Sequence, residues 1–203
     1  MEPSDHWRQV YETKRPEEVS WFQARPLPSL DALHRIGAGR SQSLIDIGGG
    51  ASVLVDALLE RGWSDLTVLD IAEPALAATR ARLGPQAHTI DWQAVDIRTW
   101  APPRAYDVWH DRAVFHFLTE AADRAAYRRA LLLGTHPASY VILATFGLEG
   151  PDKCSGLPVR RYDAASLAGE LGPDFVLFDE WQEAHHTPWE SEQRFQWAIF
   201  RRN

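Results

Sequence analysis

Short apolar runs alternate with amphipathic segments along most of this chain, and each kind of pattern predicts a different element. The apolar runs predict seven strands, at 44–47, 66–69, 89–95, 106–109, 140–145, 175–178 and 195–200. The amphipathic segments predict helices around 53–58, 73–84, 120–133 and 164–171. Strands that alternate with helices in this way are typical of a doubly wound α/β fold.

Capping residues and polar stretches set the expected boundaries of these elements. Thr119 and Asp163 are the predicted N-caps of the last two helices, and the Gly172-Pro173 pair is the predicted stop of the final helix. Residues 179–194 are expected to be a long polar connection. With 203 residues, of which 45% are hydrophobic, we expect one domain with a sizeable core.

The segment SLIDIGGGAS at 43–52 is the most informative part of the sequence. The first predicted strand ends in Asp46, and Gly48, Gly49 and Gly50 then lead into a helix. Glycines tolerate positive φ and let backbone come close to a ligand, so this strand, turn and helix predict a site for a nucleoside-type cofactor.

Acids at the ends of three successive strands narrow the kind of cofactor. Dinucleotide enzymes use a third glycine where this chain has Val53, and Asp46 would repel a pyrophosphate but suits an ammonium group. Asp70 can accept from two ribose hydroxyls, and Asp96 can accept from an adenine amino group. The pattern therefore favours a zwitterionic nucleoside over an anionic dinucleotide.

Composition and charge exclude other classes of protein. The net charge is −7 and the arginines are scattered, which argues against a nucleic-acid surface. No apolar run approaches the ~20 residues of a membrane helix, and the polar N-terminus lacks a signal-peptide pattern, so we expect a cytoplasmic protein without a membrane partner. The single cysteine, Cys154, cannot form an internal disulfide, and no Cys/His spacing indicates a metal site.

The three acidic motifs LIDIGGGAS, VLDIA and AVDI resemble those of class I S-adenosylmethionine-dependent methyltransferases over roughly residues 40–200. The resemblance implies a Rossmann-like sheet of seven strands with the last one antiparallel. It also implies that S-adenosylmethionine is the cofactor, and that Ile71 and Ile97 contact it beside the two acids. Residues 1–38 would then be an N-terminal aromatic lid segment and 40–203 the cofactor-binding core.

A narrower resemblance concerns the segment YDVWHDRAVF at 106–115, which looks like a segment of thiopurine S-methyltransferase relatives. This resemblance implies a small-molecule acceptor whose reactive atom is sulfur. Ala113 stands where those relatives have glycine, and some protein-lysine methyltransferases carry a similar element at this place. Methylation of protein lysine therefore stays open as an alternative.

Candidate acceptor residues follow the fourth predicted strand. Arg112 could fix an anionic acceptor or a thiolate, and Asp111 could orient a donor or accept a proton, although an internal ion pair between the two is the structural alternative. Trp21, with Trp7 and Phe22, is expected to hold a sulfonium by cation–π contact and to exclude water. His110 and His116 are interpreted as structural, and His185-His186 as a solvated loop.

A loop at 147–163 is expected to wall the acceptor pocket with the bases Lys153, Arg160 and Arg161, and Cys154 in it is interpreted as an ordinary thiol. The sequence thus predicts an enzyme that transfers a methyl group from S-adenosylmethionine to a small acceptor, with a thiol as the first choice. Two other functions stay open, an NAD(P)-dependent oxidoreductase and a noncatalytic protein that binds S-adenosylmethionine.

Overall fold

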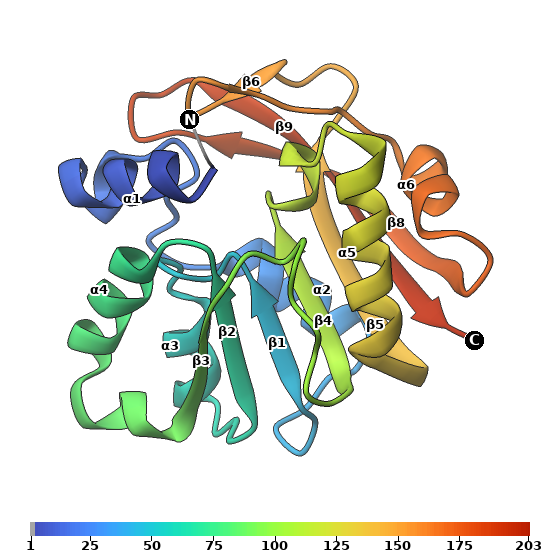
Figure 1. Cartoon of the computed structure of the whole chain (residues 1–203), viewed down its shortest axis with the longest axis horizontal. Helices are drawn as coiled ribbons and strands as arrows, with labels where there is room; N and C mark the ends of the chain where they lie inside the picture. The colour runs from blue at the N-terminus through green and yellow to red at the C-terminus, as the bar shows by residue number, and fades with distance from the viewer. Residues whose placement is uncertain (1–2) are drawn as a thin grey trace.

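The computed structural model describes residues 3–203, which form a seven-stranded sheet flanked by helices (Figure 1). The strand order is β3-β2-β1-β4-β5-β9-β8. The strands are β1 (Leu44–Ile47), β2 (Leu66–Asp70), β3 (Ile90–Ala94), β4 (Tyr106–Arg112), β5 (Thr135–Phe146), β8 (Phe175–His186) and β9 (Glu192–Arg202). β6 (Lys153–Cys154) and β7 (Leu157–Pro158) form a separate hairpin.

The sheet confirms the predicted doubly wound α/β fold with its antiparallel last strand. β1 pairs in parallel with β2 and with β4, and β9 pairs antiparallel with both β5 and β8. The chain builds outward from β1 to β3 and then returns to add β4 on the other side of β1. The strand order reverses at β1 and β4, which is where ligands bind in folds of this kind.

Helices cover both faces of the sheet and divide the core into two layers. α5 (Ala121–Leu133) and α6 (Ala164–Leu171) share one apolar cluster with the sheet. α2 (Leu27–Arg35), α3 (Leu54–Glu60) and α4 (Glu73–Leu83) contribute to the cluster on the opposite face. Strands buried on both faces explain why β1 and β2 read as continuous apolar runs rather than as alternating ones.

The N-terminal aromatic segment folds into helices that the sequence did not predict. α1 (Pro3–Thr13) is followed by the short 3-10 helix η1 (Pro16–Glu18) and by α2. Figure 1 shows α1 at the upper left, next to α4. Trp7 packs edge-on against Trp21 and Phe117, with ring centroids 5.6 and 5.0 Å apart, and so ties α1 to the core.

Several predicted boundaries are wrong. Residues 179–194 are not a loop, because β8 and β9 continue as a long antiparallel hairpin around a turn at 187–191. The N-cap of α5 is Glu120 rather than Thr119, whereas Asp163 caps α6 as predicted. β4 extends through Arg112, so that Asp111 and Arg112 lie within the strand instead of after it.

Two further 3-10 helices, η2 (Gly84–Thr89) and η3 (Phe115–Phe117), complete the described elements. Within residues 3–203, no helix combines the length and the apolar character needed to cross a lipid bilayer.

Replacing Ile142 with alanine tests whether the centre of the sheet stabilises the fold. Ile142 is fully buried on β5, so Ile142→Ala should lower the free energy of unfolding by about 2–5 kcal/mol. Val176 on β8 is half-exposed, and Val176→Ala is the matched control, with an expected change within about 0.5 kcal/mol. Urea denaturation measures both values, and equal losses would contradict the proposed position of the core.

Candidate functional site

A cavity of about 320 Å³ opens at the carboxyl ends of β1, β2, β3 and β4. We call it the main cavity. A side pocket of about 60 Å³ adjoins it, and the two share Gly48, Trp21 and Arg112 in their walls. Both lie at the point where the strand order reverses, so the fold places them where a ligand is expected.

The glycine turn after β1 is packed against side chains of the protein itself. Gly48 has φ 71°, a conformation that favours glycine, and a Cβ there would collide with Val114. A Cβ on Gly49 would collide with the carboxylate of Asp46, and one on Gly50 with that of Asp70. From the sequence, we expected these glycines to let a ligand come close to the backbone. In the structure, the space beside Gly49 and Gly50 is filled by two carboxylates of the protein itself.

Asp70 ends β2 and lines the main cavity. Its carboxylate accepts hydrogen bonds from the backbone N–H of Gly50 (3.0 Å) and of Ala72 (2.8 Å). Burial raises the pKa of Asp70 to about 6, and the two N–H donors oppose that rise. Each oxygen keeps a further lone pair, so the carboxylate can still accept hydrogen bonds from a ligand in the cavity.

Asp46 lies in the side pocket rather than in the main cavity. One carboxylate oxygen, Oδ1, is 2.7 Å from Nδ1 of His110. The other oxygen, Oδ2, is buried and has no hydrogen-bond partner in the described structure. An open carboxylate oxygen beside the glycine turn is the group that the sequence predicted for an ammonium.

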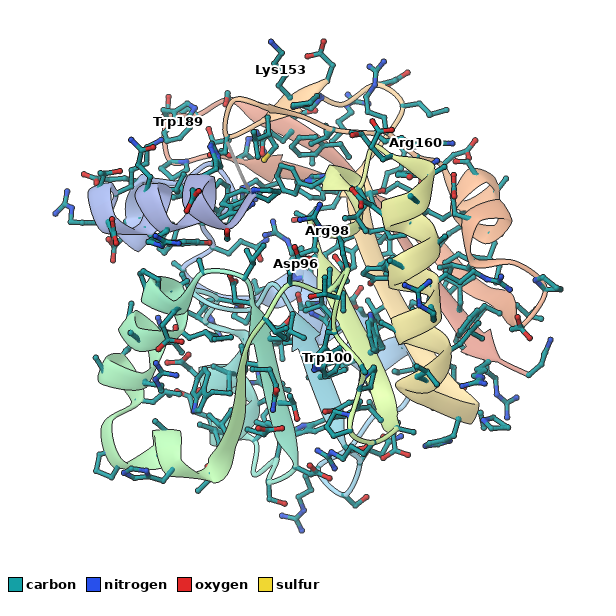
Figure 2. All side chains as sticks on the ribbon, viewed as in Figure 1. Asp96, Arg98, Trp100, Lys153, Arg160 and Trp189 are labelled. Carbon is teal, nitrogen blue, oxygen red and sulfur yellow. The ribbon has the colours of Figure 1, made fainter. Side chains whose placement is uncertain are left out.

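Asp96 and Arg98 lie together at the edge of the main cavity (Figure 2). The guanidinium of Arg98 donates to both oxygens of Asp96, at 2.6–3.0 Å, and reaches Asp123 at 3.5 Å. Burial raises the pKa of Asp96, but the hydrogen bonds from Arg98 outweigh it and lower the pKa overall. A contact with an adenine amino group would therefore use the lone pairs that Arg98 leaves open.

Arg112 projects from the end of β4 into the walls of both cavities. Nη1 donates to the carbonyl oxygen of Trp21 at 3.0 Å, while Nε and Nη2 are buried without a hydrogen-bond partner in residues 3–203. The guanidinium lies over the ring of Phe195, 5.0 Å from its centroid. Burial lowers the pKa of Arg112. Arg112 thus carries two buried N–H donor groups without a hydrogen-bond partner in residues 3–203.

Asp111 does not belong to the site, which corrects the predicted catalytic role. It faces the opposite side of β4, where it accepts from the hydroxyl of Tyr127 (2.7 Å) and from the backbone N–H of Val114 (2.8 Å). It lines neither cavity and makes no ion pair with Arg112, because neighbouring residues on a strand point to opposite faces. Its carboxylate instead fixes the turn into η3 and the position of α5.

Aromatic side chains of the N-terminal segment close one side of the main cavity. Trp7, Tyr11 and Trp21 line it, and Phe22 lines the side pocket. Trp21 is half-buried and lies in the walls of both. Ile71 and Ile97, the isoleucines beside the predicted cofactor acids, also line the main cavity.

The loop at 147–163 contributes different residues from those predicted. Figure 2 shows Lys153 at the outer rim of the molecule, while Arg160 pairs with Glu170 (3.0 Å) and Arg161 donates to the carbonyl oxygen of Gly150 (3.2 Å). The residues of this loop that line the main cavity are Cys154, Leu157 and Pro158. Burial raises the pKa of the Cys154 thiol to about 11, so the thiol is neutral.

The histidines take structural positions. His116 is buried, and burial together with the charge of Arg112 lowers its pKa to about 3. His185 and His186 lie on β8 with opposite exposures, one buried and one exposed, so the predicted solvated loop is wrong while the predicted alternation is right. Within residues 3–203, no group of three metal-binding side chains comes together.

Sequence reasoning missed several residues of the cavity wall. Tyr11 lies on a helix that was not predicted, and Phe117 and Leu118 lie in the turn after β4. Of these wall residues, only Arg98 could have been predicted from the sequence. It lies two residues after Asp96, the acid at the end of a predicted strand, and this spacing lets the two side chains form an ion pair.

Comparison with known proteins identifies similar sequences and folds. A sequence family described as "Methyltransferase domain" matches residues 44–133, which include the glycine turn and the first four strands. The trans-aconitate 2-methyltransferase of Mycobacterium ulcerans is 34% identical over 107 residues, or 52% of this chain and 38% of the relative. The match thus spans well under half of this curated relative.

Solved structures share the fold over nearly the whole chain. A SAM-dependent methyltransferase from Anabaena variabilis superposes with a TM-score of 0.78 at 15% identity, covering 100% of this chain and 96% of the other. The 1,6-didemethyltoxoflavin-N1-methyltransferase of Burkholderia thailandensis, with its acceptor and S-adenosylhomocysteine bound, superposes with a TM-score of 0.71 at 17% identity. It covers 98% of this chain and 84% of that one.

The sheet order and the carboxyl-edge cavity define the Rossmann-like fold of class I methyltransferases. The family match covers residues 44–133, so this part of the chain is similar in sequence to methyltransferase domains. The narrower likeness to thiopurine S-methyltransferases stays a prediction.

Asp111→Asn tests the structural role of the Asp111 carboxylate. Burial raises its pKa to about 6, above that of an unfolded aspartate, so the native state takes up a proton first as the pH falls. The wild type should therefore gain about 1 kcal/mol of stability relative to Asp111→Asn between pH 7 and pH 5. Denaturation at a series of pH values measures this difference, and parallel curves would contradict it.

Proposed function

We propose that this protein transfers a methyl group from S-adenosylmethionine to a small acceptor that carries a negative charge. The observation that supports this most strongly is the composition of one connected site. Asp70 and the open oxygen of Asp46 lie on its cofactor side, and the unpartnered donors of Arg112 lie beside them. Burying a charged group without a partner costs free energy, so these groups favour a ligand that carries the opposite charge.

Each part of the cofactor has a matching group in the wall. Asp70 would accept from the ribose hydroxyls and Asp46 from the ammonium of the amino-acid end. Ile71 and Ile97 would pack against the adenosine, and Asp96 would accept from the adenine amino group. Gly48, Gly49 and Gly50 would form the floor beneath the chain that joins the nucleoside to the amino acid.

S-adenosylmethionine, when bound, supplies an electrophilic methyl group on a sulfonium. The chain's task is to align a nucleophile with that carbon and to exclude water. Trp21 and Trp7 line the main cavity, and we propose that the electron-rich ring of Trp21 attracts the cationic sulfur by cation–π contact. The N-terminal aromatic segment would then close over the reactants.

The acceptor is proposed to be anionic because the main cavity offers little to deprotonate a neutral one. Its described lining contains no histidine, Asp96 and Asp123 are engaged with Arg98, and Asp70 is the proposed acceptor of the ribose hydroxyls. Burial raises the pKa of Tyr11 far above its usual range, so its phenol stays neutral. A nucleophile that arrives already ionised needs no base, and Arg112 would hold its charge.

A thiolate is our first choice for that acceptor, and a carboxylate is the second. The thiolate is supported by the resemblance of residues 106–115 to thiopurine S-methyltransferase relatives. The carboxylate is supported by the name of the Mycobacterium relative, a trans-aconitate 2-methyltransferase. Labelled cofactor offered to pools of thiols, carboxylates, amines and cell protein separates these choices, and label in protein would favour the lysine alternative.

Asp70→Ala should weaken binding of S-adenosylhomocysteine by removing the acceptor of the ribose hydroxyls. Hydrogen bonds to a charged group contribute about 1.5–3 kcal/mol, so calorimetry should show a loss of about tenfold or more. Asp65→Ala is the matched control, because Asp65 precedes β2 at its opposite end and pairs with the exposed Arg104. Unchanged affinity in Asp70→Ala would refute the proposed role.

Arg112→Met should reduce kcat/KM for an anionic acceptor by about tenfold to a hundredfold, through loss of charged hydrogen bonds. Calorimetric affinity for S-adenosylhomocysteine should change by less than about threefold, a loss of well under 1 kcal/mol. Arg160→Met removes a nearby charge that does not line the cavity and serves as the control. Equal losses of turnover and cofactor affinity would make Arg112 structural.

A further inference from the structure

A buried chain of hydrogen bonds runs from α2 to the cofactor acid of β1. Nε2 of His110 is 3.0 Å from the hydroxyl of Ser29, and Nδ1 of the same ring is 2.7 Å from Oδ1 of Asp46. All three side chains are buried, with relative exposures of 2–3%. Ser29 lies in the first turn of α2, Asp46 on β1 and His110 on β4, so the hydrogen bonds join two consecutive elements through a strand more than 60 residues further along the sequence.

The three residues also line the side pocket. Asp46 and His110 are direct neighbours in the β1–β4 ladder, so the strand pairing itself sets their side chains next to each other. A neutral imidazole satisfies both contacts, because Nδ1–H donates to the carboxylate and Nε2 accepts from the Ser29 hydroxyl. The ring then fixes one oxygen of Asp46, and Oδ2, the other oxygen of this pocket-lining residue, is buried without a hydrogen-bond partner.

The order serine, histidine, aspartate is also that of hydrolase triads, but the pocket does not suit that chemistry. At about 60 Å³ it is far smaller than the ~300 Å³ or more of typical small-molecule sites, so an acyl substrate could not reach Ser29. The unsatisfied atom is the carboxylate oxygen and not the serine hydroxyl. A compact cation is the ligand that the pocket can accept.

We propose that Ser29 and His110 are positioning residues, which hold Asp46 so that its free oxygen receives the ammonium at the amino-acid end of the cofactor. This inference rests on the proposed function. Without His110, the carboxylate could rotate about its side-chain bonds and its open oxygen would no longer point to one place. The contact to Ser29 also links the docking of α2 to binding of the amino-acid end.

Two variants of His110 test its contact with Asp46 and its contact with Ser29 separately. Asparagine places a donor near the position of Nδ1, so His110→Asn keeps the bond to Asp46. Glutamine reaches toward the position of Nε2, so His110→Gln keeps only the contact to Ser29. Calorimetry should compare S-adenosylhomocysteine with 5′-methylthioadenosine, which has the same nucleoside and sulfur but lacks the amino acid.

His110→Gln should bind S-adenosylhomocysteine about tenfold more weakly, while its affinity for 5′-methylthioadenosine stays within about twofold of the wild type. His110→Asn should retain both affinities within about threefold. Ser29→Ala should show the same selective loss as His110→Gln, only smaller, and gives a second test if the histidine variants do not fold.

Two results would overturn the inference. Equal losses for both ligands would mean that His110 only supports the fold, and undiminished affinity for S-adenosylhomocysteine would mean that Asp46 needs no positioning. Failure of the proposed function looks different, because the wild-type protein would then bind neither nucleoside.

Discussion

The packing of two buried carboxylates against the glycine turn is the constraint on which the rest of the site depends. Gly49 and Gly50 have no side chains, and Asp46 and Asp70 occupy the space that a Cβ would need. Asp70 binds the turn through the N–H of Gly50, so the turn and the end of β2 hold each other in place. Hydrogen bonds within the protein hold both carboxylates in place. Each carboxylate still has lone pairs that can accept hydrogen bonds from a ligand.

The arrangement of charge around that turn follows from the pairing of β1 with β4. Successive residues of β4 point to opposite faces, so His110 and Arg112 lie on the side of the pockets and Asp111 lies toward α5. One face of β4 thus supplies both His110, which contacts Asp46, and the guanidinium of Arg112. The other face supplies a buried carboxylate that fixes the following turn.

The fold could be predicted from sequence because its strands are short, apolar and separated by clear helix signals, as at Leu44–Ile47 and Leu66–Asp70. The positions of Asp46, Asp70 and Asp96 at the ends of predicted strands also indicated that they lie at the carboxyl edge of the sheet. Strands at 175–178 and 195–200 were predicted, but the extension of β8 and β9 through 179–194 was not, because an edge strand with exposed, polar residues resembles a loop in sequence. The direction of the Asp111 side chain was not predicted, because the strand was expected to end before this residue. The face of the sheet on which a side chain lies depends on the strand register.

A crystal structure of the complex with S-adenosylhomocysteine would test the account most directly. The account predicts the ribose hydroxyls on Asp70, the ammonium on Oδ2 of Asp46, and the sulfur facing Trp21 and the space in front of Arg112. A ligand bound outside the main cavity, or one whose amino-acid end points away from the side pocket, would contradict it.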